Sequence, residues 1–438
     1  MGAGLAVYRG LTWGLGLVLP AAAGLGRADG AWRGALTGAS AEGAASAGSI
    51  WVHAASMGEV GAARRWVDAL VDRGVRPPLL LTTRTRTGLE RARREMSGRV
   101  AARIAPLDLP QTLRALLESA CPSRLDVVET EVWPNLILEA RRARVAVAFV
   151  SGTVTARTER RLRALGVAGP ALLGSGVFAL AQDDEAAARF RALGIPEARV
   201  RVMGDLKADF PSPATVPVEG ERAAVVFGSF RPGEEATALA IAEALRGIGA
   251  EEGNRAGADP GSGRPLLVVA PRHEEGAARA RRLFAGAGYV VFERGEAERA
   301  VETLPAWLSR AAGGAGTRVA ILSTHGELPE AYDHARLAIV GGTFAPYGGH
   351  TPLEAASRGC PVIAGPHHDA VARPLGAIAR EGGAAIAPDA ASAAAIAASW
   401  WRDAGFAARS AAALRAAGSL GGAARRGLEV LEAWRLVP

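Results

Sequence analysis

The chain has 438 residues, of which 49% are hydrophobic and 22% charged, so it is long enough for two or three domains with ordinary globular cores. Its formal net charge of +7 favours an anionic partner, but only 5% of its residues are aromatic, which argues against stacking on nucleic-acid bases. The two cysteines, Cys121 and Cys360, match no metal-binding spacing and exclude a disulfide framework, as expected in a reducing compartment.

An uncharged N-terminal stretch, residues 11–26, lies between Arg9 and Arg27. It is shorter than the ~20 residues of a simple transmembrane span. A signal peptide, a short or interfacial anchor and a buried helix are the three interpretations. We favour an uncleaved membrane-anchoring segment over residues 1–33, with Arg9, Arg27 and Arg33 facing anionic headgroups and the rest of the chain in the cytoplasm.

Alternating strand and helix patterns begin after this segment. A strand predicted at 49–54 is followed by a helical pattern that places Glu59 at the strand-to-helix turn, where a carboxylate serves either catalysis or helix capping. A second strand, 78–83, ends in the loop 84–88, RTRTG, whose arginines and hydroxyls suit an anion or a solvated turn.

Further strands are predicted at 101–106, 125–129, 145–151 and 177–181, and residues 200–207 close this half. The fourth strand of this half runs into Glu129-Thr130-Glu131-Val132-Trp133-Pro134-Asn135, which places two carboxylates beside a tryptophan. Lys207 is the single lysine among 51 basic residues. Because arginine and lysine are not interchangeable where a compact ammonium must fit, we interpret Lys207 as needed for function, the alternative being chance.

A proline-rich linker at 210–220 separates this half, 34–209, from a second half, 221–438. Strand patterns resume and alternate with helices, at 223–228, 265–270, 289–292, 318–322, 338–340 and 360–364. The sequence therefore predicts an α/β fold with two doubly wound, Rossmann-like domains facing a cleft.

The most informative stretch is 338–368, where a strand ends at Gly341-Gly342 and a second glycine pair precedes His350. Thr351 is the expected N-cap of the next helix, and Glu354 completes a capping-box pattern. A helix N-terminus behind glycine loops offers backbone N–H groups to a phosphate, and Glu354 suits a ribose. Tight packing of the glycines is the alternative.

Several of these motifs occur together in one order along the chain. They are HAASMGE at 53–59, ETEVWPN at 129–135, GDLK at 204–207, PRH at 271–273, GEL at 326–328 and the stretch from Gly341 to Glu354. In this combination the sequence resembles the Kdo (3-deoxy-D-manno-oct-2-ulosonic acid) transferases of lipopolysaccharide synthesis, which have the GT-B fold and an N-terminal membrane-anchoring segment.

The resemblance implies inverting transfer of Kdo from CMP-Kdo to a lipid A precursor, without a metal or other cofactor and without nucleic acid, at the cytoplasmic face of the inner membrane. It implies Glu59 as the general base and Glu131 as a supporting catalytic carboxylate. Residues implied for binding CMP-Kdo are Lys207, Ser229, Arg272, His273, Gly326, Glu327, Gly341, Gly342, Gly349, His350, Thr351 and Glu354. Those implied for binding the acceptor are Ser56, Gly58, Arg84, Thr85 and Thr87.

The chain departs from the family pattern in several places, including a poor match of Ser151-Gly152-Thr153 to the family's Asn-Ala-Arg segment. Thr351 stands where the family usually has Asn, and Arg84 and Arg86 enrich a loop that tends to carry Met and Pro. Two alternatives therefore stay open: a GT-B transferase that uses another nucleotide sugar, and a non-catalytic envelope lipid-binding protein of the same fold. The number of sugars added and the oligomeric state are also left open by the sequence.

Overall fold

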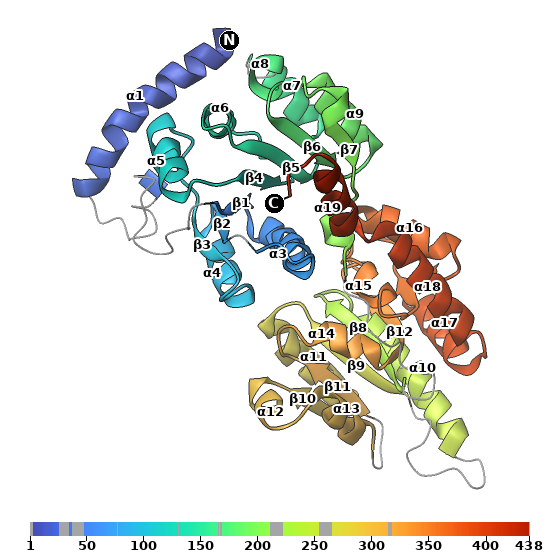
Figure 1. The fold of residues 1–438 in the computed structure, drawn as a ribbon. Helices are drawn as coiled ribbons and strands as arrows, with labels where there is room; N and C mark the ends of the chain where they lie inside the picture. Colours follow the sequence, from blue (N-terminus) through green and yellow to red (C-terminus); the bar gives the residue numbers. More distant parts are fainter. Residues whose placement is uncertain are drawn as a thin grey trace. The chain divides into compact units, whose positions relative to one another are not determined.

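The computed structural model divides into two compact units, one formed by residues 1–209 with 421–438 and the other by residues 210–420 (Figure 1). The structure describes residues 3–25, 35–36, 48–76, 78–129, 131–164, 166, 169–210, 222–253, 265–313 and 318–437, with the side chains of 20–25, 249–253 and 274 left aside. The predicted linker, apart from Phe210, and the predicted anchor residues Arg27 and Arg33 lie outside these ranges.

The first unit is built on a parallel sheet. Its described strands follow the order β3-β2-β1-β4-β5-β6-β7, the doubly wound order in which the chain reverses direction beside β1. Their bounds are β1 (Ile50–His53), β2 (Leu79–Thr83), β3 (Ala101–Ile104), β4 (Arg124–Val128), β5 (Ala146–Gly152), β6 (Val177–Ala181) and β7 (Val200–Val202). Most of these strands are short apolar runs buried on both faces, as parallel sheets require.

Helices cover both faces of this sheet. They are α1 (Ala3–Leu25), α3 (Met57–Asp72), α4 (Arg86–Glu95), α5 (Pro110–Ala120), α6 (Pro134–Arg142), α7 (Ala156–Ala164), α8 (Pro170–Leu173), α9 (Asp184–Ala192) and α19 (Ala423–Ala433). Short 3-10 turns, η1 (Glu197–Arg199) and η2 (Leu206–Ala208), flank β7. Alternate residues of β1 enter different cores, Trp51 on one face and Ile50 with Val52 on the other.

Helix α1 lies beside α5 along one side of the first unit (Figure 1). Its inner side carries buried Leu5 and Tyr8, whose hydroxyl donates to Asp108 at 2.7 Å. The outer side is apolar and exposed, with Val7, Leu11, Trp13, Leu15, Leu17 and Val18. Among the described residues, no helix is both long and apolar enough to cross a membrane.

The prediction that Arg9 faces lipid headgroups is wrong. Its guanidinium pairs with Glu139, a buried carboxylate of α6 that also pairs with Arg114 and Arg142. Arg9 therefore helps to hold α1 against the first unit.

Helix α19 corrects the predicted domain boundary. Residues 421–438 were assigned to the second half, but they belong to the first unit. The buried face of α19, including Leu428 and Leu431, packs in the core of the first unit beside α3, and Asp209 accepts hydrogen bonds from the N–H groups of Ala423 and Ala424.

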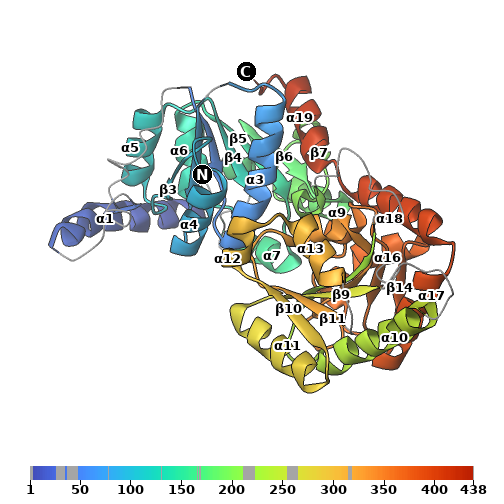
Figure 2. The same cartoon turned by 90° about the horizontal axis from the view of Figure 1, so that it is seen from below.

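The second unit repeats the architecture with described strands in the order β10-β11-β9-β8-β12-β13-β14, all paired in parallel. The strands are β8 (Ala224–Phe230), β9 (Leu266–Pro271), β10 (Val290–Arg294), β11 (Arg318–Leu322), β12 (Ala335–Val340), β13 (Val362–Ala364) and β14 (Ala384–Ile386). The helices are α10 (Glu235–Gly253), α11 (Glu274–Gly286), α12 (Glu296–Val301), α13 (Leu304–Ala312), α14 (Leu328–Asp333), α15 (Leu353–Ala356), η4 (Asp369–Val371), α16 (Ala372–Arg380), α17 (Ala390–Arg402) and α18 (Phe406–Leu420). Helices α10 and α17 pack side by side (Figure 2).

Candidate active site

The carboxylates predicted in the first unit gather where its sheet changes direction. Strands β1 and β4 are neighbours, although two further strands separate them in sequence. Glu59 follows β1, and Glu129 and Glu131 follow β4. Because ligands of doubly wound sheets bind beyond the carboxyl ends of the strands at such a switch point, this is the expected place for a site.

Glu59 lies in the first turn of α3 and turns its carboxylate back toward the end of β1. The Ala55 N–H donates to Glu59 Oε2 at 2.7 Å, and the Ser56 hydroxyl lies 3.2 Å from Oε1. Burial raises the pKa of the Glu59 carboxyl, and the nearby charge of Glu131 adds to this, while the Ala55 and Ser56 hydrogen bonds oppose it. A fixed carboxylate with a raised pKa has the properties of a general base.

Glu131 is fixed by Trp133, whose indole N–H donates to its carboxylate. The guanidinium of Arg84 stacks over the same indole, 4.3 Å from the ring centroid. Arg84, the first residue of the 84–88 loop, therefore contacts the ETEVWPN motif after β4 through Trp133.

Glu129 was predicted as part of the carboxylate motif after the fourth strand, but no role at the site was assigned to it. Its carboxylate lies 2.6 Å from Lys207 Nζ, and its backbone is left-handed, with φ of 62°. Burial raises its pKa, the Lys207 ammonium opposes this, and the charge of Glu59 adds to it. Lys207, which we expected to bind the donor, is therefore a partner of this cluster in the first unit. The signal in the sequence was the scarcity of lysine.

Two of the four other predicted acceptor residues are helix caps. Ser56 is the N-cap of α3, and Thr85 is the N-cap of α4 and accepts from the Gly88 N–H at 3.0 Å. Thr87 is exposed beside Thr85, and Gly58 lies in the first turn of α3. Of the predicted acceptor set, Arg84 is therefore the side chain that reaches the carboxylate motif.

In the second unit, a pocket of about 120 Å³ forms at the carboxyl ends of β8, β9 and β11. Four of the predicted donor-binding residues line it, namely Ser229, Arg272, His273 and Gly326. His273 is also the N-cap of α11, so the positive end of that 13-residue helix adds to the attraction for an anion.

Arg231 connects this pocket to His350 and was missed by the sequence prediction. Its guanidinium lies 3.2 Å from His273 Nε2 and 3.4 Å from His350 Nε2. Burial lowers the pKa of His350 to about 4, and the charges of Arg272 and Arg231 add to this, so His350 is neutral at pH 7. Arg231 follows β8, but nothing local in the sequence indicates a partner more than one hundred residues away.

The glycine loop after β12 is used differently from our prediction. The Gly342 N–H donates to buried Glu234 at 2.8 Å, and the Gly349 N–H donates to the Gly342 carbonyl. A Cβ on Gly341 would lie 2.3 Å from the Ser229 carbonyl oxygen. The N–H groups of Gly342 and Gly349 are thus engaged within the loop, and Gly341 allows close packing on β8.

The expected helix start at Thr351 is also wrong. Helix α15 has four residues, and its N-cap is Pro352, without a side-chain cap. Glu354 therefore completes no capping box, although it lies in the first turn. Such a short helix adds little dipole for a phosphate.

Glu327, which was predicted to contact the donor, forms a buried ion pair with Arg294 in the structure. Its carboxylate accepts two hydrogen bonds from buried Arg294, at 2.7 and 2.8 Å, and one from Thr324. These hydrogen bonds hold the pKa of Glu327 below its ordinary value. Glu327 therefore anchors the segment that carries Thr324 and Gly326 along the pocket.

Two parallel sheets, each with polar side chains beyond the carboxyl ends of its strands, define a two-domain, Rossmann-like α/β protein, which confirms that part of the predicted fold class. The same fold occurs in the UDP-GlcNAc 2-epimerase of Neisseria meningitidis, with a TM-score of 0.53, 12% identity, and coverage of 87% of this chain and 99% of that one.

Sequence comparison identifies the family. Residues 31–210 match the family model described as 3-deoxy-D-manno-octulosonic-acid transferase. The Bordetella pertussis 3-deoxy-D-manno-octulosonic acid transferase is 34% identical over 73% of this chain and 72% of its own length, and that of Haemophilus influenzae is 27% identical over 73% and 70%. The chain belongs to the Kdo transferase family, as its motifs predicted.

Proposed function

We propose that the protein transfers Kdo from CMP-Kdo to a lipid A precursor with inversion at the anomeric carbon. The observation that carries the mechanism is the position of Glu59, whose carboxylate is fixed by Ala55 and Ser56 beside Glu131. Glu59 takes the proton of the acceptor hydroxyl as the new carbon–oxygen bond forms. The bond between the anomeric carbon and the phosphate oxygen breaks, and CMP leaves with the electron pair.

The second unit is proposed to bind CMP-Kdo. Arg231, Arg272 and His273 meet the phosphate and its growing negative charge, aided by the N-terminus of α11. Neutral His350 supplies a hydrogen bond, while Gly341, Gly342 and Gly349 shape the neighbouring loop. The main phosphate ligands are thus proposed to be the side chains of Arg231, Arg272 and His273, and not the backbone N–H groups of the glycine loop as first predicted.

The protein is proposed to act at the cytoplasmic face of the inner membrane through α1. Its outer face is apolar and exposed, and its inner face is tied to the first unit by Tyr8 and Arg9. A helix with this arrangement suits the plane of a membrane surface, where the acceptor lipid lies.

The reaction is proposed to need no metal ion. The described residues contain no cluster of three or more His, Cys, Asp or Glu side chains suited to a metal. The charge of the leaving phosphate is instead met by arginine and histidine. Transfer should therefore continue in EDTA, and loss of transfer that Mg²⁺ restores would contradict this part of the proposal.

The decisive experiment is transfer from CMP-Kdo, generated in situ, to a lipid A precursor, measured by mass spectrometry of the lipid. The wild type should add one or more Kdo masses, and Glu59→Gln should lower the rate by at least a hundredfold. Glu90→Gln, an exposed change on α4, is the matched control. Full activity of Glu59→Gln would overturn the base, whereas no transfer by the wild type, with CMP binding intact, would indicate another sugar or acceptor.

A further inference from the structure

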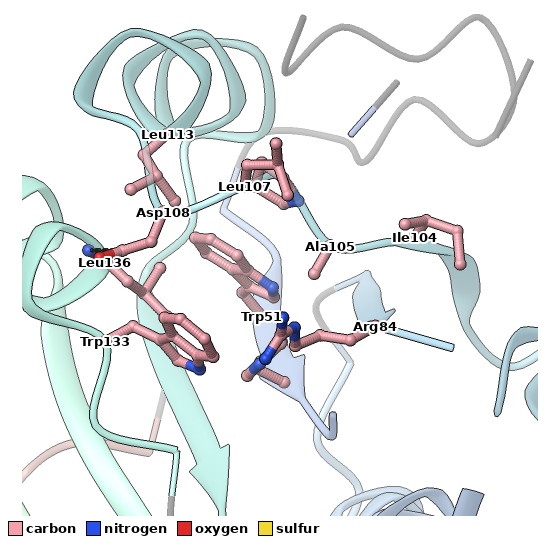
Figure 3. Close-up of a pocket in the computed structure, with 11 residues that line it drawn as sticks. Trp51, Arg84, Ile104, Ala105, Leu107, Asp108, Leu113, Trp133 and Leu136 are labelled. Atoms are coloured by element: carbon pink, nitrogen blue, oxygen red, sulfur yellow. Dashed lines mark hydrogen bonds between the residues drawn. The ribbon is translucent and has the colours of Figure 1, made fainter. Parts of the chain in front are cut away.

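A pocket of about 100 Å³ beside the carboxylate cluster has no role in the mechanism above (Figure 3). It is formed by β1, the loop after β2, the segment after β3, and helices α5 and α6. Its lining residues are Trp51, His53, Arg84, Ile104, Ala105, Pro106, Leu107, Asp108, Leu113, Trp133 and Leu136. The volume is several times the ~10–15 Å³ that one water needs, so the pocket has room for a larger group.

The walls of this pocket are mainly apolar. Indole rings from Trp51 and Trp133 and aliphatic side chains from α5 and α6 face it (Figure 3). Asp108, the acidic residue of the lining, is already committed, since it accepts from Tyr8 and from the N–H groups of Asn135 and Leu136. A sugar ring, with hydroxyls all round, would leave most of its hydrogen bonds unmade here, whereas a hydrocarbon chain fits the lining.

One polar atom is nevertheless buried at this pocket without a partner in the structure. His53 is only 2% exposed, and its Nε2 makes no hydrogen bond. Its Nδ1 lies 2.9 Å from Thr82 Oγ1, which accepts from the Trp51 indole N–H at 2.8 Å. When the Thr82 hydroxyl donates to Nδ1, the proton of the neutral imidazole lies on Nε2 and is a free donor; this is the tautomer on which the proposal below rests.

The pocket joins the carboxylates to helix α1. On one side, Trp133 donates to Glu131, and Arg84 stacks on Trp133. On the other side, Asp108 accepts from Tyr8 of α1, and Leu113 belongs to α5, against which α1 packs. With α1 at a membrane surface, as proposed above, an acyl chain that leaves the membrane beside α1 meets this pocket next to the carboxylates.

We propose that this pocket binds one acyl chain of the acceptor lipid, and that His53 Nε2–H donates to the carbonyl oxygen that attaches the chain. The hydrocarbon fills the space between the two tryptophans, and the carbonyl satisfies the buried donor. The pocket thereby selects acylated acceptors and fixes the acceptor hydroxyl relative to Glu59. This inference rests on the proposed function, because it assigns the acceptor's chain.

Binding is tested first, without catalysis. A bromine-labelled fatty acyl amide should quench tryptophan fluorescence of the full chain, and the double variant Trp51→Phe, Trp133→Phe should remove most of the quenching. Ala105→Phe fills the pocket and should weaken binding at least tenfold, whereas Ala101→Phe, on neighbouring β3 and outside the lining, should not. Equal binding by the wild type and Ala105→Phe would overturn the proposal.

The role of His53 is tested with a second probe. A bromoalkane of the same length lacks the carbonyl, so the wild type should bind the amide about tenfold more tightly, the size expected for one hydrogen bond. His53→Phe should lose this preference and still bind the alkane. A preference that survives in His53→Phe would overturn the hydrogen bond.

Selectivity is tested in the transfer reaction. Ala105→Phe should lower kcat/KM for the acylated acceptor at least tenfold relative to a deacylated one, mainly through KM, and Ala101→Phe should not. Equal loss with both acceptors would overturn the selective role. No transfer by the wild type with either acceptor would instead count against the proposed function, and the fluorescence experiment would still decide whether the pocket binds an acyl chain.

Discussion

Lys207 Nζ lies 2.6 Å from the carboxylate of Glu129, a residue whose backbone adopts φ of 62°. Non-glycine residues in this region are strained by roughly 1–3 kcal/mol and persist where the surrounding structure determines them. The Lys207 ammonium opposes the rise in the pKa of Glu129 that burial and the charge of Glu59 cause. The chain's single lysine and its proposed base belong to one electrostatic cluster.

Lys207→Met is expected to lower kcat/KM at least tenfold. Without the ammonium the pKa of Glu129 rises, because burial and the charge of Glu59 are no longer opposed. Lys207→Arg should recover only part of the activity, since a planar guanidinium does not occupy the place of an ammonium. The measurement is the transfer rate, with Arg201→Met, an exposed change in the same unit, as control. Wild-type activity in Lys207→Met would refute the assignment.

The pH profile should respond to Glu131. The base must be ionised, so activity falls as the pH drops through the pKa of Glu59, which lies above its ordinary value. Glu131→Gln removes a charge that raises this pKa, so the acidic limb of kcat/KM should move to lower pH. Burial, the larger cause, is unchanged, so the limb should not return to the ordinary value. If the acidic limb did not move, the charge of Glu131 would not influence the pKa of Glu59.

Membrane association should depend on the outer face of α1. Leu11 is 67% exposed and Val18 is 65% exposed, and their spacing places them on one side of the helix. The double variant Leu11→Glu, Val18→Glu should lose most binding to anionic vesicles in a flotation assay. Val301→Glu, at a residue 85% exposed in the second unit, should not. Equal flotation of all three proteins would exclude α1 as the contact.

The buried pair between Arg294 and Glu327 should support the second unit. Arg294→Met leaves a carboxylate buried without its partner, which typically costs about 3–5 kcal/mol. Arg310→Met removes an exposed pair with Glu302, which water screens, and should cost much less. The free energy of unfolding of each variant is measured by urea unfolding, with hydrogen exchange to show which unit is affected. Equal decreases in the two variants would contradict the prediction that burial makes the Arg294–Glu327 pair more important.

The sheets were largely predictable from the sequence. A parallel strand is buried on both faces and therefore appears as a short continuous apolar run, and such runs recur along this chain. The strands at 101–104 and 335–340 overlap the predicted ones. Strand β14 (Ala384–Ile386) was not predicted, because three residues rich in alanine cannot be distinguished in sequence from the alanine-rich helices around them. Glu59 and Glu131 stood out because they follow strands, but their proposed roles came from the resemblance to the Kdo transferases. Contacts between distant segments were not predictable, as Arg231 with His350 shows.

The boundary at the C-terminus failed for a related reason. The apolar spacing of α19 predicts a helix with one buried face, but it carries no information about which core receives that face. In the structure, the N–H groups of Ala423 and Ala424 donate to Asp209, and these hydrogen bonds help to hold α19 on the first unit. These partners lie on either side of the whole second unit in sequence.

The return of α19 to the first unit has a consequence for biosynthesis. At ~5–20 residues per second, a ribosome needs roughly 10–40 s to synthesise residues 210–420. Only after that is α19, which packs on α3, synthesised. Throughout this interval the nascent first unit exposes the apolar surface on which Leu428 and Leu431 finally pack. The protein is therefore expected to depend on cotranslational chaperones, and a separately expressed first unit needs residues 421–438 fused to its own end.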